Sequence, residues 1–208
     1  MHMSRPRADP AESPDARTRI VDAVRDLAEL TGLRKLSMDE VARRAKVGRA
    51  TLYTYFPGRD ALLAAAVAED LARLTDAVTR AASDYEDADE RLVHGFAQAY
   101  RSLRQHGPLS AILRINPEIL LPFVITDSRD TLDMGSALID TSLGLHDLDE
   151  TSRAALSEHV TRLLHTLMLV PRTSLGLEDR DGPERYARAF LVPVRRHLST
   201  HPYRPKRS

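Results

Sequence analysis

Apolar residues recur at helical spacing along nearly the whole chain, and no stretch shows the sustained alternation of a surface strand. The first helical stretch has four apolar side chains on one face: Ile20, Val24, Leu27 and Ala28. Ser13-Pro14-Asp15 predicts its start, with Pro14 at the first helical position, and Gly32 predicts its end. Because glycine is sparse at 9 residues, the pattern predicts an all-α protein.

The clearest helix start lies at residues 36–41. Ser37 can cap the helix and Glu40 follows three positions later, which is the spacing of a capping box. Leu36 and Val41 occupy the two positions of a hydrophobic staple. We therefore expect a helix that runs to about Ala45.

A second short helix is expected from about Ala50 to Phe56. Leu52 and Phe56 are four residues apart and share its buried face, which leaves the other side chains of this helix largely outside. Pro57-Gly58 ends it, and a long helix follows with Asp60 in its first turn, where a carboxylate complements the helix dipole.

Further helices are predicted downstream, at about 87–105, 109–115, 117–121, 127–144, 150–170 and 182–198. Pro193 should kink or restart the last of them. This pattern predicts four regions along the chain: a disordered arm at 1–14, a small helical domain at 15–60, a larger helical domain at 61–200 and a disordered tail at 201–208.

Two short helices joined by a tight turn, the second rich in exposed polar and aromatic groups, form a helix-turn-helix pattern. The second helix of such a pair fits the major groove of B-DNA. The whole chain has no net charge, with 30 basic and 30 acidic residues. From Arg34 to Arg59, however, seven basic residues stand against two acids, a local charge of +5. Affinity for phosphate depends on this local cluster, so overall neutrality does not exclude nucleic-acid binding.

Residues 17–63 resemble the N-terminal DNA-binding domain of the TetR family of bacterial transcription regulators. The residues that carry the resemblance, at matching spacing, are Gly32, Ser37, Val41-Ala42, Ala45, Val47, Thr51-Leu52-Tyr53-x-Tyr55-Phe56 and Arg59-x-x-Leu62-Leu63. The resemblance implies a helix-turn-helix domain joined by a long helix to a helical ligand-binding and dimerisation domain. It further implies a homodimeric repressor that binds a near-palindromic operator in double-stranded DNA.

The resemblance also implies which residues contact DNA. Ser37 would donate to a phosphate at the start of the first motif helix, and Arg59 would touch another phosphate. The complete expected set is Ser37, Lys46, Arg49, Ala50, Thr51, Tyr53, Thr54, Tyr55 and Arg59. Arginine with guanine is the commonest specific pairing, so Arg49 is the candidate for direct base readout.

Three positions depart from the family pattern. Lys46 stands where glycine is common, and a positive φ there would cost about 1 kcal/mol. Gly48 replaces a small hydroxyl residue and removes one usual cap and phosphate donor. Ala50 replaces a glycine and could offer a methyl group to thymine. Lys46 and Gly48 keep an alternative open: a ligand-binding or protein-interaction dimer whose helix-turn-helix no longer binds DNA.

The resemblance implies a small-molecule effector within the larger domain. Candidate lining residues mix aromatic, flexible and aliphatic side chains: Phe96, Tyr100, Leu113, Ile119, Phe123, Met134, Leu138, His165 and Met168. This mixture suits an apolar ligand, although core packing is an alternative for each residue. Aromatic residues make up only 5% of the chain and tryptophan is absent, which favours a lipophilic neutral or acidic effector over a cationic one.

Dimerisation is expected through the helices at about 150–170 and 182–198, again because the family usually pairs through its last two helices. The motif also needs a dimer for a physical reason. One short recognition helix reads only a few base pairs, so two half-sites supply the remaining specificity.

Several classes of protein are excluded or disfavoured. The chain has no cysteine, no apolar run of membrane-spanning length and no secretory leader. It also lacks zinc-protease, calcium-loop, phosphate-loop and nucleophile-elbow motifs. We therefore expect a cytoplasmic protein, associated with the nucleoid when bound, with no enzymatic activity, cofactor, metal or membrane partner.

Overall fold

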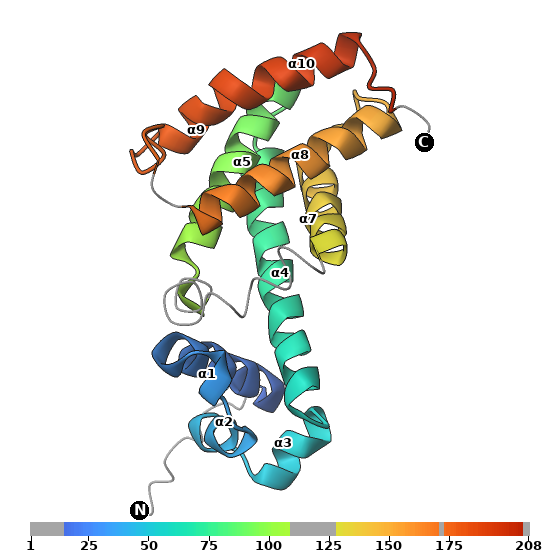
Figure 1. The fold of residues 1–208 in the computed structure, drawn as a ribbon. Helices are drawn as coiled ribbons and strands as arrows, with labels where there is room; N and C mark the ends of the chain where they lie inside the picture. The colour runs from blue at the N-terminus through green and yellow to red at the C-terminus, as the bar shows by residue number, and fades with distance from the viewer. Residues whose placement is uncertain (1–14, 109–127, 171–172, 206–208) are drawn as a thin grey trace, which may run out of the picture. The chain divides into compact units, whose positions relative to one another are not determined.

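The computed structural model describes residues 15–108, 128–170 and 173–205. The regular secondary structure within these ranges is entirely helical, as predicted, and none of these helices is long and apolar enough to cross a membrane. The predicted arm and the helices at 109–115 and 117–121, with Leu113, Ile119 and Phe123, lie outside the described residues. The chain divides into two compact units, Met1–Val67 and Ala68–Ser208 (Figure 1).

The first unit begins with α1 (Ala16–Thr31). The sequence predicted a start at Pro14, but Asp15 has an extended backbone (ψ 149°) and is the residue before the first helical turn. α1 ends where predicted, because Gly32 takes a positive φ of 76° and donates its N–H to the carbonyl of Ala28.

Three further helices complete the first unit: α2 (Met38–Arg44), α3 (Arg49–Tyr55) and the first turns of α4 (Arg59–Ser83). A single apolar core joins them, with members from every helix: Ile20, Val21, Val24, Leu27, Leu36, Val41, Ala42, Leu52, Phe56, Leu62 and Ala66. Each large side chain buried in this way stabilises the fold by about 1.5–3 kcal/mol. The positions of α2 and α3 are therefore set by their inward faces, and their outward faces can vary for function.

The second unit contains the rest of α4, α5 (Ala88–Gln105), α7 (Ser128–Leu143) and α8 (Glu150–Leu169). Two of these helices have aspartate caps. The Asp87 side chain accepts from the N–H groups of Asp89 and Glu90 at 2.9 and 3.0 Å. Asp149 caps α8 in the same way, so both helix starts are specified locally by the sequence.

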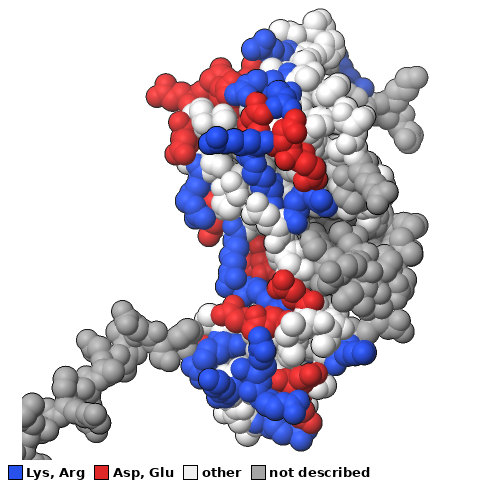
Figure 2. Space-filling model, turned by 90° about the vertical axis from the view of Figure 1, so that its left-hand side faces the viewer, with Lys and Arg blue, Asp and Glu red and all other residues white. Residues whose placement is uncertain are grey.

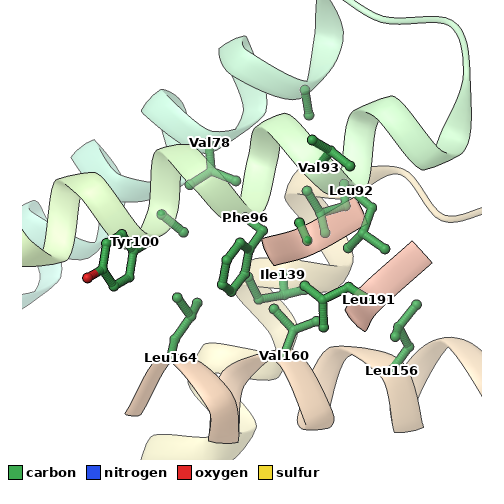
Figure 3. Packing of buried hydrophobic residues seen from close by; sticks show 14 of the residues in the cluster. Val78, Leu92, Val93, Phe96, Tyr100, Ile139, Leu156, Val160, Leu164 and Leu191 are labelled. Atoms are coloured by element: carbon green, nitrogen blue, oxygen red, sulfur yellow. The ribbon is translucent and has the colours of Figure 1, made fainter. Parts of the chain in front are cut away.

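The core of the second unit is built around α5. Figure 3 shows Phe96 of α5 lying among side chains from three other elements: Ile139 of α7, Val160 and Leu164 of α8, and Leu191. Gly95 permits a close approach at the same level, because a Cβ atom there would lie 2.1 Å from Cδ2 of the buried Leu143.

The last helical region is not one regular helix. It consists of α9 (Gly182–Tyr186), a π-helical segment (Ala187–Leu191) and α10 (Val192–Thr200). Pro193 lies in the first turn of α10, where its missing N–H costs least. The expectation that Pro193 restarts this helix is confirmed, and the π-helical segment is the local adjustment that accommodates it.

Candidate nucleic-acid interface

The start of α2 is organised as the sequence predicted. The Ser37 hydroxyl oxygen accepts from the N–H of Glu40 at 3.2 Å, and Leu36 and Val41 are both buried beside it. The N-terminus of α2 is thus held by one cap hydrogen bond and one apolar contact. Ser37 itself is exposed, so its hydroxyl can donate outward to an anion.

A tight turn joins α2 to α3. Ala45 donates its N–H to Val41 at 2.8 Å, and Val47 donates its N–H to Ala42 at 3.0 Å, which closes the turn. Lys46 between them has φ 54°, the left-handed conformation that its place in the turn predicted. This side chain is exposed, so the strained position presents a cation to solvent.

α3 has one buried face and one exposed face. Leu52 and Phe56, at the helix and its C-cap, are buried in the core of the first unit. The outward face holds hydroxyl and aromatic groups from Thr51, Tyr53, Thr54 and Tyr55, all of which are exposed. A helix of this kind can present polar side chains to a groove while its apolar side holds it in place.

Arg49 is the first residue of α3 and lies at the exposed end of this face. Its Nε atom is 2.8 Å from Oδ1 of Asp39, the second residue of α2. Asp39 was absent from the predicted site. Asp39 and Arg49 are ten residues apart and lie on different helices. Whether they meet depends on the angle of the turn between α2 and α3, so no local pattern in the sequence predicts the pair.

Arg59 and Arg44 make structural contacts. The Arg59 side chain donates from Nη2 to the Leu33 carbonyl at 2.8 Å and from Nε to the Leu36 carbonyl at 3.3 Å. It therefore holds the short 3-10 turn (Leu33–Lys35) that precedes α2. Arg44 donates from two nitrogens to Oδ2 of Asp26, which ties α2 to α1.

Three further cations of the motif differ from Arg44 and Arg59 in their contacts. No carboxylate among the described residues pairs with Lys35, Arg43 or Lys46, and all three side chains are exposed. Figure 2 shows Lys and Arg side chains gathered over the first unit, at the lower end of that view. An exposed cation cluster beside a polar helix can bind phosphates without base preference, while α3 supplies the groups that distinguish bases.

Comparisons with known proteins agree with this geometry. Residues 20–66 match the family model of the bacterial regulatory proteins of the tetR family. Helix-turn-helix transcriptional regulators from two strains of Mycobacterium tuberculosis are each 28% identical to this chain over 179 residues, covering 86% of it and 85% of the relative. Residues 20–66 belong to a DNA-binding domain of the TetR family.

Solved structures share the fold of this chain. The repressor AlkX of a Dietzia strain superposes with a TM-score of 0.60 at 18% identity, covering 93% of this chain and 97% of that one. FadR of Bacillus halodurans gives 0.55 at 17% identity, covering 93% and 100%. A TetR-family regulator of Streptomyces coelicolor gives 0.61 at 20% identity, covering 86% and 99%. The family consists of DNA-binding transcriptional regulators that act as dimers, not of enzymes.

The predicted effector residues of the regulator fall into three groups. Phe96, Tyr100, Leu138 and Met168 are buried together in the core of the second unit. His165 is half-buried, and Met134 is 43% exposed and lies outside that core. Leu113 and Phe123 are outside the described residues.

Tyr100 also borders a hollow of about 450 Å³ that the sequence did not predict. The lining comes from the end of α5 and from the loop before α9: Tyr100, Arg101, Arg104, Gln105, Leu177, Glu178, Asp179 and Arg180. The Tyr100 hydroxyl donates to Oε1 of Glu178 at 3.2 Å. Burial raises the pKa of Tyr100 and the charge of Glu178 raises it further, so the hydroxyl stays protonated as a donor.

Proposed function

We propose that this regulator is a repressor whose two α3 helices read a near-palindromic operator and whose affinity for DNA changes when a small lipophilic molecule binds the second unit. One observation carries the proposal. The outward face of α3 bears hydroxyl, aromatic and cationic groups and the small side chain of Ala50, while its inward face is buried in the core of the first unit. A helix that is held in place by its buried apolar side chains, and that exposes polar side chains on its other face, suits entry into the major groove.

The roles of the individual residues follow from their placement. Ser37, Thr51, Tyr53 and Tyr55 are exposed around the motif and would donate to phosphates. Arg49 would read a guanine from the N-terminal end of α3. Lys46, Ala50 and Thr54 complete the predicted surface. The Thr54 hydroxyl donates to the Ala50 carbonyl at 2.9 Å, so its oxygen would meet DNA as an acceptor.

Arg59 would touch a phosphate with the part of its guanidinium that the protein leaves unused. Its Nε and Nη2 atoms donate to carbonyls, and its Nη1 atom lies 3.9 Å from Oδ1 of the exposed Asp60. An arginine has five N–H donors, so this arrangement leaves donors for DNA. We therefore propose a double role for Arg59, in the fold of the first unit and at the phosphate backbone.

The dimer would form through α8 and the region from α9 to α10. Phe190 is 52% exposed and Val194, one turn later, is also exposed. Leu169 and Val170 at the end of α8 are further exposed apolar residues. Apolar groups of this size in solvent favour burial against a second copy of the chain. In such a dimer the two α3 helices would meet successive major-groove faces about 34–36 Å apart.

A lipophilic effector is supported by the side chains and by the structural neighbours. Phe96, Leu138 and Met168 provide an apolar environment within the second unit. Burial lowers the pKa of His165, and the positive charge of Arg162 lowers it further, so this ring is a neutral polar group at pH 7. AlkX is implicated in the biodegradation of n-alkanes, and FadR is a regulator of fatty acid degradation. Differential affinity of such a ligand for two α3 separations would set the response.

A mobility-shift assay with the full-length protein and the DNA flanking its own gene tests the repressor proposal. We expect a discrete complex whose affinity falls steeply with salt. Adding an n-alkane or a long-chain fatty acid in detergent should release the DNA, whereas detergent alone should not. A protein that binds no flanking DNA would contradict operator binding. Binding that resists both lipids, and also a total lipid extract, would contradict the effector proposal.

A further inference from the structure

Asp39 and Arg49 form an ion pair on the surface that faces away from the core of the first unit. Oδ1 of Asp39 lies 2.8 Å from Nε of Arg49, and both side chains are exposed. The pair joins the second residue of α2 to the first residue of α3. It therefore links the two helices of the motif on their solvent side, opposite the apolar core.

The two backbones under this pair are rigid. α2 is capped by Ser37, and the turn between the helices is closed by the hydrogen bond from Val47 to Ala42 at 3.0 Å. Leu52 anchors α3 one turn after Arg49. Asp39 therefore meets Arg49 from a fixed position, and the pair restricts where the guanidinium can point.

The pairing atom decides what the guanidinium can still do. Nε is the guanidinium nitrogen that lies 2.8 Å from Asp39, while Nη1 and Nη2 carry four of the five N–H donors. Those donors are the ones that reach guanine O6 and N7 together in a bidentate contact. Fixing the long side chain before DNA arrives also reduces the conformational entropy that is lost on binding.

The other arginines of the motif differ from Arg49 in this respect. Arg44 is turned toward α1 by Asp26, and Arg59 is bound to backbone carbonyls. A carboxylate at a phosphate-binding surface lowers affinity for every DNA sequence, because it repels the backbone. Asp39 complements the dipole of α2 from its first turn, but it lowers general DNA binding, and a gain in sequence discrimination would offset that loss.

We propose that Asp39 is a specificity-determining residue, which positions Arg49 to read one guanine in each half-site. The proposal rests on the proposed role of α3 as the recognition helix. Asp39 acts through Arg49 and is a positioning residue. Its carboxylate also disfavours DNA that lacks the guanine, because Arg49 then gains no base contact to balance the repulsion.

Selection from a pool of randomised DNA duplexes tests this proposal without a known operator. The full-length wild type, Asp39→Ala, Asp39→Asn and Arg49→Ala are each used to enrich bound duplexes, and base preferences are compared position by position. Asp60→Ala is the matched control. Asp60 is the second residue of α4, so this change also removes one carboxylate from a first helical turn of the same unit.

We expect Arg49→Ala to abolish a guanine preference at one position of each half-site. Asp39→Ala should lower the preference at that same position by about two- to five-fold, which is less than Arg49→Ala does, because Arg49 keeps its donors and loses only an exposed ion pair that directs them. Asp39→Asn keeps an acceptor oxygen and should lie between Asp39→Ala and the wild type. Asp60→Ala should leave the preference unchanged and only strengthen binding to all duplexes.

Three results would overturn the proposal while leaving α3 as the recognition helix. If the Asp39 variants behave like Asp60→Ala, Asp39 affects DNA binding only through general electrostatic repulsion. A change at a position other than the one that Arg49 controls would make Asp39 a base reader itself. If Arg49→Ala alters no position, Arg49 has no base for Asp39 to direct it to. A wild type that enriches no motif at all would instead overturn the proposed recognition role of α3, and the inference with it.

Discussion

Arg195 of α10 donates from Nε to Oδ1 of Asp89 at 2.5 Å, and both residues are buried. Asp89 lies in the first turn of α5, so the contact joins two helices that are far apart in the chain. Arg196 donates to the other carboxylate oxygen at 2.6 Å, and Arg195 also pairs with Asp147. Every oxygen of the buried carboxylate therefore has a charged donor.

This cluster predicts that the second unit loses stability in acid. Burial alone would raise the pKa of Asp89, but hydrogen bonds from Arg195 and Arg196 outweigh it and hold the pKa below its ordinary value of 3.8. The ionised form is thus favoured by folding, so its contribution is complete above pH 3.8 and is lost as pH falls below it. Urea unfolding from pH 7 to pH 2.5 should show a fall in stability that is smaller in Asp89→Asn, while Glu184, whose pKa is also lowered by its pairing with Arg101, keeps part of the fall in both proteins.

Asp89→Ala measures the same cluster at neutral pH. Removing one of the two carboxylates that pair with the buried Arg195, and leaving it only Asp147, should cost about 3 kcal/mol in free energy of unfolding. The exposed Asp133 supplies the control, since Asp133→Ala removes a carboxylate of α7 that no described cation contacts. Equal losses for the two variants would show that Asp89 does not stabilise the fold through its ion pairs.

Lys46→Gly should have opposite effects on stability and on DNA binding. Glycine relieves the strain of the positive φ and loses some of this gain to chain entropy, so we expect about 0.5–1 kcal/mol of stabilisation. The lost cation should make the slope of log affinity against log salt less negative by about 0.9 for each protomer in contact with DNA. Thermal unfolding and salt titrations of binding measure the two effects.

Lys46→Asn separates those effects, because asparagine tolerates the left-handed conformation but carries no charge. It should reproduce the change in salt dependence with a smaller gain in stability. An unchanged salt slope in both variants would show that Lys46 touches no phosphate.

Arg59→Ala should weaken both the fold and DNA binding. The loss of the hydrogen bonds to the Leu33 and Leu36 carbonyls should lower the free energy of unfolding by about 2 kcal/mol. DNA affinity should fall by a similar factor for all sequences, unlike in Arg49→Ala, where sequence choice relaxes. Arg59→Lys retains the charge and should recover more DNA affinity than stability. Chemical denaturation and binding to operator and random duplexes give both quantities.

Phe190→Asp should convert the dimer to a monomer without unfolding it. Phe190 is 52% exposed in the single chain, so a charge there costs the isolated fold little but prevents burial against a second copy. Sedimentation velocity should show the change in mass, and operator affinity should fall with it. Leu30→Asp is the control, since Leu30 is 64% exposed and lies on α1. A Phe190→Asp protein that remains dimeric would place the interface elsewhere.

Local signals in the sequence were sufficient for much of the first unit. Gly32 ends α1 and Ser37 caps α2 because each depends on only a few neighbouring residues, whereas the positive φ of Lys46 was expected from the family resemblance. The start of α1 was two residues off, since Pro14 and Asp15 are both acceptable at a helix start.

Contacts between distant residues could not be predicted in this way. Arg59 reaches carbonyls more than twenty residues away, and no helical period reveals which donor will point inward. The predicted pocket shows a related limit. Phe96 and Met134 were both predicted to line a pocket, but Phe96 is central to a core and Met134 is exposed. An apolar stripe identifies a buried face without saying whether a ligand, a partner or the protein itself covers it.

The π-helical segment (Ala187–Leu191) changes the direction in which the side chains of α10 point around the helix axis. Such a segment has the length of an α-helix with one residue inserted, and one residue corresponds to a rotation of about 100° about the helix axis. Tyr186 is partly buried against the core, and its ring centroid lies 4.8 Å from that of the exposed Phe190, four positions later. A one-residue deletion within this segment would therefore turn the outward face of α10 away from its present direction without changing any of its side chains.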